Sequence, residues 1–124
     1  MPKTVLIIED DADIQAIFAK VLYSKGYSVL TATQGAEGVH LARKYRPEMI
    51  LLDIRMPVMD GWGALKYLKS YSETREIPVC GISAMAPGPA AGGEEGVNFD
   101  HILKKPIDPV EVVRVVEGRI GPAD

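Results

Sequence analysis

Five short apolar segments, each separated from the next by an interval of different pattern, constrain the fold of this chain more than any other feature. They read TVLII (4–8), SVLTA (28–32), EMILLD (48–53), PVCGIS (78–83) and DHILK (100–104). Each has the length of a strand, and their apolar residues form continuous runs rather than alternating ones. Continuous runs rich in β-branched residues are typical of parallel strands covered on both faces. The sequence therefore predicts five parallel strands.

Helical patterns occupy most of the intervals between these segments. The first apolar stripe recurs at helical spacing through Ile14, Ile17, Phe18, Val21 and Leu22, and Gly26 closes that helix. Further helices are expected after Gly35, after Gly61 and from Asp108, an N-cap residue followed by a proline. Strict alternation of strands and helices with right-handed crossovers predicts one doubly wound α/β domain over residues 1–124.

The fourth interval is poorly suited to a helix. The stretch APGPAAGGEEG (86–96) contains two prolines and four glycines. Gly92 and Gly93 together cost a helix about 2 kcal/mol relative to alanine, and no apolar stripe compensates for them. We expect a loop at 86–91 and at most a short helix near 92–96, so the fourth helix is irregular or shortened.

Charge and composition exclude several classes of partner. The 124 residues are 47% hydrophobic and 25% charged, which suits one globular domain. The net charge of -3 provides no basic face for nucleic acid, so direct nucleic-acid binding is not expected. No apolar run approaches the ~20 residues of a membrane span, and the single cysteine cannot form an intramolecular disulfide. We expect a cytoplasmic protein that makes no membrane contact.

Polar and charged residues collect at the ends of the predicted strands. Glu9, Asp10 and Asp11 follow the first strand, Asp53 ends the third, Ser83 ends the fourth, and Lys104 and Lys105 end or follow the fifth. In a doubly wound sheet, ligands bind at the carboxyl ends of the strands. Because the first and third strands are expected to be neighbours, Glu9, Asp10 and Asp53 are predicted to share one pocket.

Three carboxylates in one pocket require a positive charge. At about 4 Å apart they repel by about 4 kcal/mol per pair at an effective dielectric near 20. Mg²⁺ prefers such oxygen ligands, and a lysine from another strand adds a fixed positive charge. This set is typical of phosphoryl-transfer sites. The alternative is structural: the acidic residues complement the dipole of the following helix, while Ser83 and Lys105 are a strand-end hydroxyl and an exposed lysine.

Four segments of the chain resemble a known family. IIEDD at the first strand end, LLDIRMPVMDG at the third, GISA at the fourth and LKKP at the fifth resemble the signature blocks of response-regulator receiver domains of two-component signalling, the CheY-like superfamily. The resemblance covers essentially the whole chain. It implies a five-stranded parallel sheet of order 2-1-3-4-5 and a phosphoacceptor protein rather than a conventional enzyme.

The resemblance also implies a role for each residue of the site. Asp53 would accept a phosphoryl group from a sensor histidine kinase or a phosphotransfer protein. Mg²⁺ would be bound by Glu9, Asp10, Asp53 and the backbone carbonyl of Arg55. Ser83 would hydrogen-bond the phosphoryl group, and Lys105 would pair with one of its oxygens. The signal would reach a downstream protein through a changed face formed by the fourth helix, fifth strand and fifth helix, and a homodimer is compatible with this interpretation.

Two features depart from the family pattern. Ile102 stands three residues before Lys105, where members with an aromatic switch have tyrosine or phenylalanine. A branched aliphatic side chain cannot report activation by rotating a ring. The second departure is the stretch 86–96. Since the gap from Ser83 to Lys105 has the family's length, we expect this stretch to lie inside one domain. We also expect it to become ordered, or to be bound by a partner, on activation.

Two other functions stay open at this point. A pseudo-receiver, which binds partners without being phosphorylated, usually lacks an acidic ligand or the lysine, and both are present here. A phosphatase of the haloacid dehalogenase type also uses a nucleophilic aspartate and Mg²⁺, but needs a second aspartate two positions later. This chain has Arg55 at that position. A stand-alone regulator and a part of a longer regulator or hybrid kinase are both compatible with the sequence.

Overall fold

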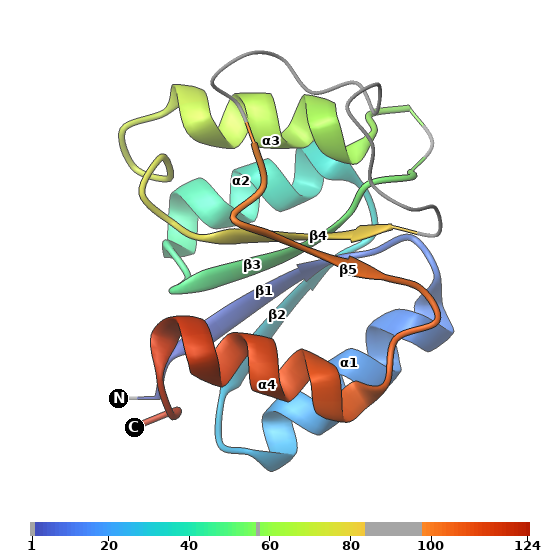
Figure 1. The fold of residues 1–124 in the computed structure, drawn as a ribbon. Coiled ribbons are helices and arrows are strands. Elements are labelled where there is room, and N and C mark those ends of the chain that lie inside the picture. Colours follow the sequence, from blue (N-terminus) through green and yellow to red (C-terminus); the bar gives the residue numbers. More distant parts are fainter. Residues whose placement is uncertain (1, 57, 84–97) are drawn as a thin grey trace.

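A computed structural model describes residues 2–56, 58–83 and 98–124 of the chain (Figure 1). Its strands are β1 (Thr4–Ile8), β2 (Ser28–Ala32), β3 (Met49–Asp53), β4 (Val79–Ser83) and β5 (His101–Lys104). Its helices are α1 (Ala12–Ser24), α2 (Gly35–Tyr45), α3 (Gly61–Ser70) and α4 (Pro109–Ile120). All predicted strands are therefore present in the structure, and β3, β4 and β5 each begin one residue later than predicted. The predicted irregular fourth element lies outside the described residues.

The strands form one parallel sheet of order β2-β1-β3-β4-β5. Helices α2 and α3 cover one face of this sheet, and α1 and α4 cover the other (Figure 1). This arrangement confirms the predicted doubly wound α/β fold. Among the described residues, no helix combines the length and the apolar character needed to cross a membrane.

Successive strand residues belong to two separate cores. In β1, Val5 and Ile7 pack with α1 and α4, whereas Leu6 and Ile8 pack with α2 and α3. All four side chains are fully buried. Because side chains of a strand point alternately to the two faces of a sheet, a sheet covered on both faces needs apolar residues at every position. This is the physical reason for the continuous apolar runs in the sequence.

The ends of two helices show why they begin and stop where they do. Asp11 caps α1, and its carboxylate accepts hydrogen bonds from the backbone amides of Asp13 and Ile14. Asp108 caps α4 in the same manner, with a proline in the first turn. The predicted stripe of α1 is wider than its buried face: Phe18 is buried, but Ile17 is 50% exposed.

Helix α2 approaches the sheet closely at Gly38. A Cβ atom at this position would lie 2.3 Å from Cδ1 of Ile8 in β1. Carbon atoms do not approach so closely in proteins, so only glycine fits unless Ile8 or the helix shifts. The glycine thus sets how near α2 lies to the strand that carries Glu9 after its last residue.

Candidate functional site

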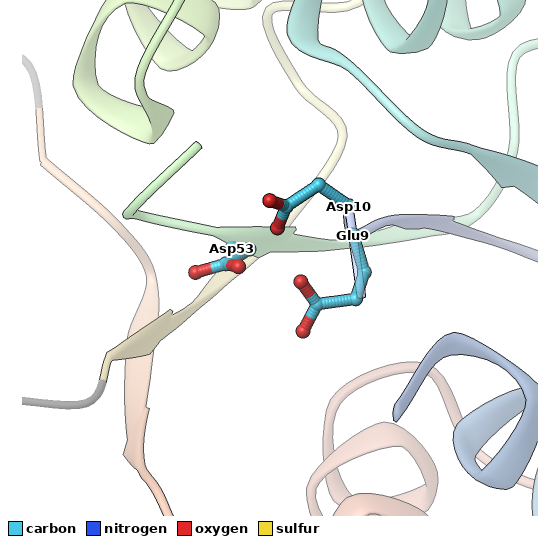
Figure 2. Close-up of side chains that lie close together, drawn as sticks. All are labelled: Glu9, Asp10 and Asp53. Carbon is cyan, nitrogen blue, oxygen red and sulfur yellow. The ribbon is translucent and has the colours of Figure 1, made fainter. Parts of the chain in front are cut away.

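Three carboxylates meet at the carboxyl ends of β1 and β3. Asp53 is the last residue of β3, and Glu9 and Asp10 follow β1 directly. The two strands are parallel neighbours, so residues beyond their ends reach the same edge of the sheet. One carboxylate oxygen from each of Glu9, Asp10 and Asp53 lies within 4.8 Å of the others, and Figure 2 shows the three side chains gathered at this edge. The structure thus brings the three residues together in one pocket, as the sequence predicted.

Two of the three carboxylates are removed from solvent. Glu9 and Asp53 are 0% and 2% exposed, whereas Asp10 is exposed. Oδ1 of Asp53 accepts a hydrogen bond from the backbone amide of Arg55 at 3.0 Å. Oε2 of Glu9 accepts a longer one from the backbone amide of Asp11 at 3.4 Å. The pocket therefore has a buried floor and an open acidic rim.

The loop after β3 returns to the backbone of Asp53 at Gly61. The Gly61 amide donates to the carbonyl of Ile54 at 2.8 Å. A Cβ atom on Gly61 would lie 2.7 Å from the carbonyl oxygen of Asp53 and 2.5 Å from Cα of Ile54. Asp60, just before it, caps α3 by accepting from the Gly63 amide at 2.9 Å. The sequence marked Gly61 as the start of a helix, but not this close contact with the site.

Lys105 extends into the pocket from the far side. Its backbone amide donates to the carbonyl of Ser83 at 2.6 Å, so β4 and β5 stay paired up to the site. Its Nζ atom lies 3.2 Å from Oε1 of Glu9 and 3.5 Å from Oδ2 of Asp53. Ser83, 7% exposed, ends β4 at the same edge of the sheet, while Lys104 is exposed. Of the two adjacent lysines, only Lys105 forms ion pairs with these carboxylates.

The crowding of charge shifts the acid–base properties of this pocket. Burial, a hydrogen bond with Asp53 and the negative charge of Asp53 together raise the pKa of Glu9 to about 8. Partial burial acts to lower the pKa of Lys105, but the charges of Asp53 and Glu9 outweigh it and raise that pKa. The single lysine thus does not neutralise the carboxylates.

The donor set fits a divalent cation. Oε1 of Glu9 is buried and, among the described residues, accepts no hydrogen bond of good geometry, although the Lys105 ammonium lies near it. Buried polar atoms are normally paired, so this oxygen marks a position for a further electropositive partner. Three carboxylates converging on one point are hard oxygen ligands of the kind that Mg²⁺ prefers. For Arg55, the structure shows the backbone amide bound to Asp53, which holds this residue beside the carboxylates.

Comparison with known proteins places this fold and site in a family. Residues 5–117 match the family model described as the response regulator receiver domain. The polar-differentiation response regulator DivK of Brucella anthropi is 32% identical over 126 residues, covering 99% of this chain and 100% of the relative. The chain belongs to the response regulator receiver family. It is of the class of phosphoacceptor proteins rather than conventional enzymes.

Solved structures agree with this assignment. The chemotaxis protein CheY4 of Vibrio cholerae superposes with a TM-score of 0.89 at 25% identity, covering 97% of this chain and 100% of the other. The receiver domain of the sensor histidine kinase PA1611 of Pseudomonas aeruginosa superposes with a TM-score of 0.87 at 27% identity, covering 98% and 99%. That structure has a magnesium ion coordinated in its active site cleft. The chain thus has the CheY-like receiver fold over nearly its whole length.

Proposed function

We propose that this protein accepts a phosphoryl group on Asp53 and passes the signal to a protein partner. The position of Asp53 is the observation that supports this proposal most directly. The side chain is buried, its Oδ1 accepts a hydrogen bond from the Arg55 amide, and its Oδ2 lies 3.5 Å from the Lys105 ammonium. A carboxylate fixed in this manner is oriented for nucleophilic attack. The donor is a phosphohistidine on a sensor histidine kinase or a phosphotransfer protein.

In the proposed transfer, an oxygen of Asp53 attacks the phosphorus atom of the phosphohistidine. The P–N bond breaks, a P–O bond to Asp53 forms, and the histidine nitrogen leaves with the electron pair and takes up a proton from solvent. Lys105 pairs with one phosphoryl oxygen, and the Ser83 hydroxyl donates a hydrogen bond to another. Both residues lie, like Asp53, at the carboxyl ends of neighbouring strands, which supports these roles.

Glu9, Asp10, Asp53 and the carbonyl of Arg55 are the proposed ligands of Mg²⁺. When bound, the ion neutralises the negative charge that accumulates between the carboxylates and the incoming phosphoryl group. Two observations support this assignment: Oε1 of Glu9 is buried and accepts no well-formed hydrogen bond from the described residues, and the PA1611 receiver has a magnesium ion coordinated in its active site cleft.

The signal is proposed to leave through the face around β5 and α4, the predicted fifth helix. The fourth element, which is also predicted to belong to this face, lies outside the described residues. Lys105 directly follows β5, so its pairing with a phosphoryl group acts on that strand first. Ile102 is half-buried in the middle of β5 and has no ring to rotate, so we propose that displacement of the strand itself carries the change. Amide chemical shifts measured with and without beryllofluoride test this proposal. Changes confined to β1 and β3 would contradict it.

Intact-mass measurement tests the central proposal. After incubation with acetyl phosphate and Mg²⁺, the native protein is expected to gain one phosphoryl mass, and Asp53→Ala none. Asp60→Asn, which removes a charge outside the pocket but keeps a capping side chain, is the matched control and is expected to gain the mass. A native protein that gains nothing, although folded and able to bind Mg²⁺, is instead a pseudo-receiver.

A further inference from the structure

The side chains of β5, the strand that directly precedes Lys105, contribute little burial that could fix its position in the sheet. β5 has four residues and lies at the edge of the sheet; among the described residues it pairs with β4 alone. Leu103 is its one buried residue and Ile102 is half-buried, while His101 and Lys104 are exposed. The register of a strand is set mainly by its pattern of buried side chains. With a single buried residue, this pattern holds β5 poorly.

Asp100, the residue just before β5, attaches the strand to β4 by two hydrogen bonds. Its backbone amide donates to the carbonyl of Val79 at 2.9 Å, and its Oδ2 accepts from the amide of Val79 at 2.8 Å. Val79 is fully buried, so its amide needs a partner inside the protein. The carboxylate of Asp100 is that partner, at the point where β4 begins.

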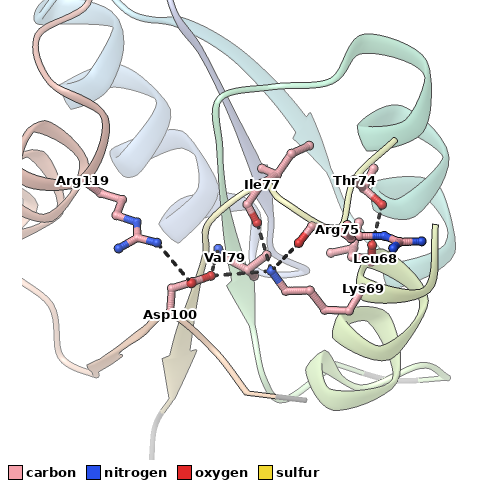
Figure 3. A network of polar contacts seen from close by, with 8 residues as sticks. All are labelled: Leu68, Lys69, Thr74, Arg75, Ile77, Val79, Asp100 and Arg119. Atoms are coloured by element: carbon pink, nitrogen blue, oxygen red, sulfur yellow. Dashed lines mark hydrogen bonds and ion pairs between the residues drawn. The ribbon is translucent and has the colours of Figure 1, made fainter. Parts of the chain in front are cut away.

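The same carboxylate also reaches a helix on each face of the sheet. Oδ2 lies 3.7 Å from Nζ of Lys69 in α3, and Oδ1 lies 3.3 Å from Nη2 of Arg119 in α4 (Figure 3). Lys69 is itself held by the carbonyls of Arg75 and Ile77, each at 3.2 Å. Asp100 therefore joins β4, α3 and α4 at the amino-terminal ends of the strands, whereas the acidic pocket lies at their carboxyl ends.

The register that Asp100 sets determines where Lys105 arrives. Cys80 pairs with His101 and Ser83 with Lys104, after which the Lys105 amide bonds to the Ser83 carbonyl. A slip of two residues would keep every side chain on its face but move Lys105 by about 7 Å along the sheet. That is about twice the 3.2 Å and 3.5 Å that separate its ammonium from the two carboxylates.

We propose that Asp100 is a positioning residue for Lys105. By holding the start of β5 against β4, α3 and α4, it keeps the strand in the register that delivers Lys105 to the phosphoryl site. This inference rests on the proposed function, in which Lys105 pairs with the phosphoryl group. The three carboxylates come from β1 and β3, so their positions do not depend on Asp100.

A double-mutant cycle between Asp100 and Lys105 tests the inference, with the initial rate of phosphoryl uptake from acetyl phosphate as the readout. Asp100→Ala is expected to lower the rate about tenfold when Lys105 is present and to have no effect in the Lys105→Ala background. Asp100→Asn keeps an oxygen for the Val79 amide but loses the charge, so a loss of about threefold is expected, again only with Lys105. Equal losses in both backgrounds, or no loss in either variant, overturn the inference.

Two controls separate positioning from general damage. In the Lys105→Ala background, where no lysine competes with the metal, the Mg²⁺ dissociation constant measured by calorimetry is expected to change by less than about twofold when either Asp100 substitution is added. A larger change means that the whole pocket is disturbed and overturns the inference. Thr74→Val removes a buried hydrogen bond to the Leu68 carbonyl away from β5 and is expected to keep the native rate. A loss equal to that of Asp100→Ala would also overturn it.

Hydrogen exchange of the Lys105 amide provides a readout that needs no phosphoryl transfer. Its exchange is expected to be about tenfold faster in Asp100→Ala, while amides of β1 and β3 keep their native rates. Unchanged exchange at Lys105 overturns the inference. If the native protein takes up no phosphoryl group but the exchange at Lys105 responds, the proposed function fails and the register role stands. If Asp100→Ala does not fold, the rate of phosphoryl uptake and the exchange of the Lys105 amide are both measured on Asp100→Asn.

Discussion

Replacing Asp53 by asparagine is expected to stabilise the metal-free protein. The change removes one of two buried carboxylates whose charges oppose each other, Glu9 and Asp53. Asparagine keeps the size of the side chain and an oxygen for the Arg55 amide. The substitution therefore changes mainly the charge of the side chain at position 53.

The magnitude follows from two distances. Oxygens of Glu9 and Asp53 lie within 4.8 Å, where two unit charges repel by about 3.5 kcal/mol at an effective dielectric of 20. The lost ion pair with the partly exposed Lys105, at 3.5 Å, offsets on the order of 1 kcal/mol. The net gain is about 2.5 kcal/mol, or about 10 °C in Tm for a domain of this size.

Thermal unfolding followed by circular dichroism measures this gain. EDTA removes metal, and a pH of about 8.5 keeps Glu9, whose pKa is about 8, largely ionised. Asp108→Asn makes the same change of charge at a helix N-cap, where asparagine caps equally well, so its Tm is expected to stay near the native value. Mg²⁺ at about 100 times its Kd is expected to stabilise the native protein by about 2.7 kcal/mol, and Asp53→Asn much less. A Tm for Asp53→Asn at or below the native value would refute the Coulomb argument.

Three further predictions concern other parts of the molecule. In metal-free buffer, the free energy of unfolding is expected to fall by about 1.4 kcal/mol per pH unit between the usual pKa of 4.5 for Glu9 and its folded pKa of about 8, because the folded state retains a proton that the unfolded state releases. Urea unfolding at several pH values checks this, and a Glu9→Gln variant with the same slope would contradict it. Gly38→Ala is expected to destabilise the protein by about 2 kcal/mol, because its Cβ would lie 2.3 Å from a side-chain atom of β1. Gly118→Ala, whose Cβ would have no atom within 4 Å, is expected to stabilise α4 by about 0.5 to 1 kcal/mol. Equal effects of the two substitutions in denaturant unfolding would contradict the packing argument. Tyr27→Phe loses a hydrogen bond of 2.6 Å to a backbone carbonyl at the end of α4, so we expect a loss of about 1 kcal/mol, and an unchanged Tm would show that this bond contributes nothing.

The strands and the starts of α2, α3 and α4 were predictable because their signals are local. β1 and β2 begin and end at the predicted residues, since continuous apolar runs are required wherever both faces of a sheet are covered. Asp108 and the proline after it mark the start of α4 by satisfying the first-turn amides. The acidic pocket was predictable from topology, because the carboxyl ends of neighbouring parallel strands meet at one edge.

The burial of individual side chains was less predictable. Ile17 belongs to the apolar stripe of α1 and is nevertheless half-exposed, because the position of α4 decides which side of α1 is covered. The predictions for the stretch 86–96 lie outside the described residues.

The sequence by itself determined which residues can serve the chemistry: the acids after β1 and β3, the serine that ends β4 and the lysine after β5. Only the tertiary structure decided their contacts. The ion pairs of Lys105 with Glu9 and Asp53 depend on the register of an edge strand. That register is held by Asp100 through Val79 and Arg119, which lie 21 and 19 residues away in the chain. Local patterns specify strands and caps, but the register of one strand against another is set by contacts between residues that are distant in sequence.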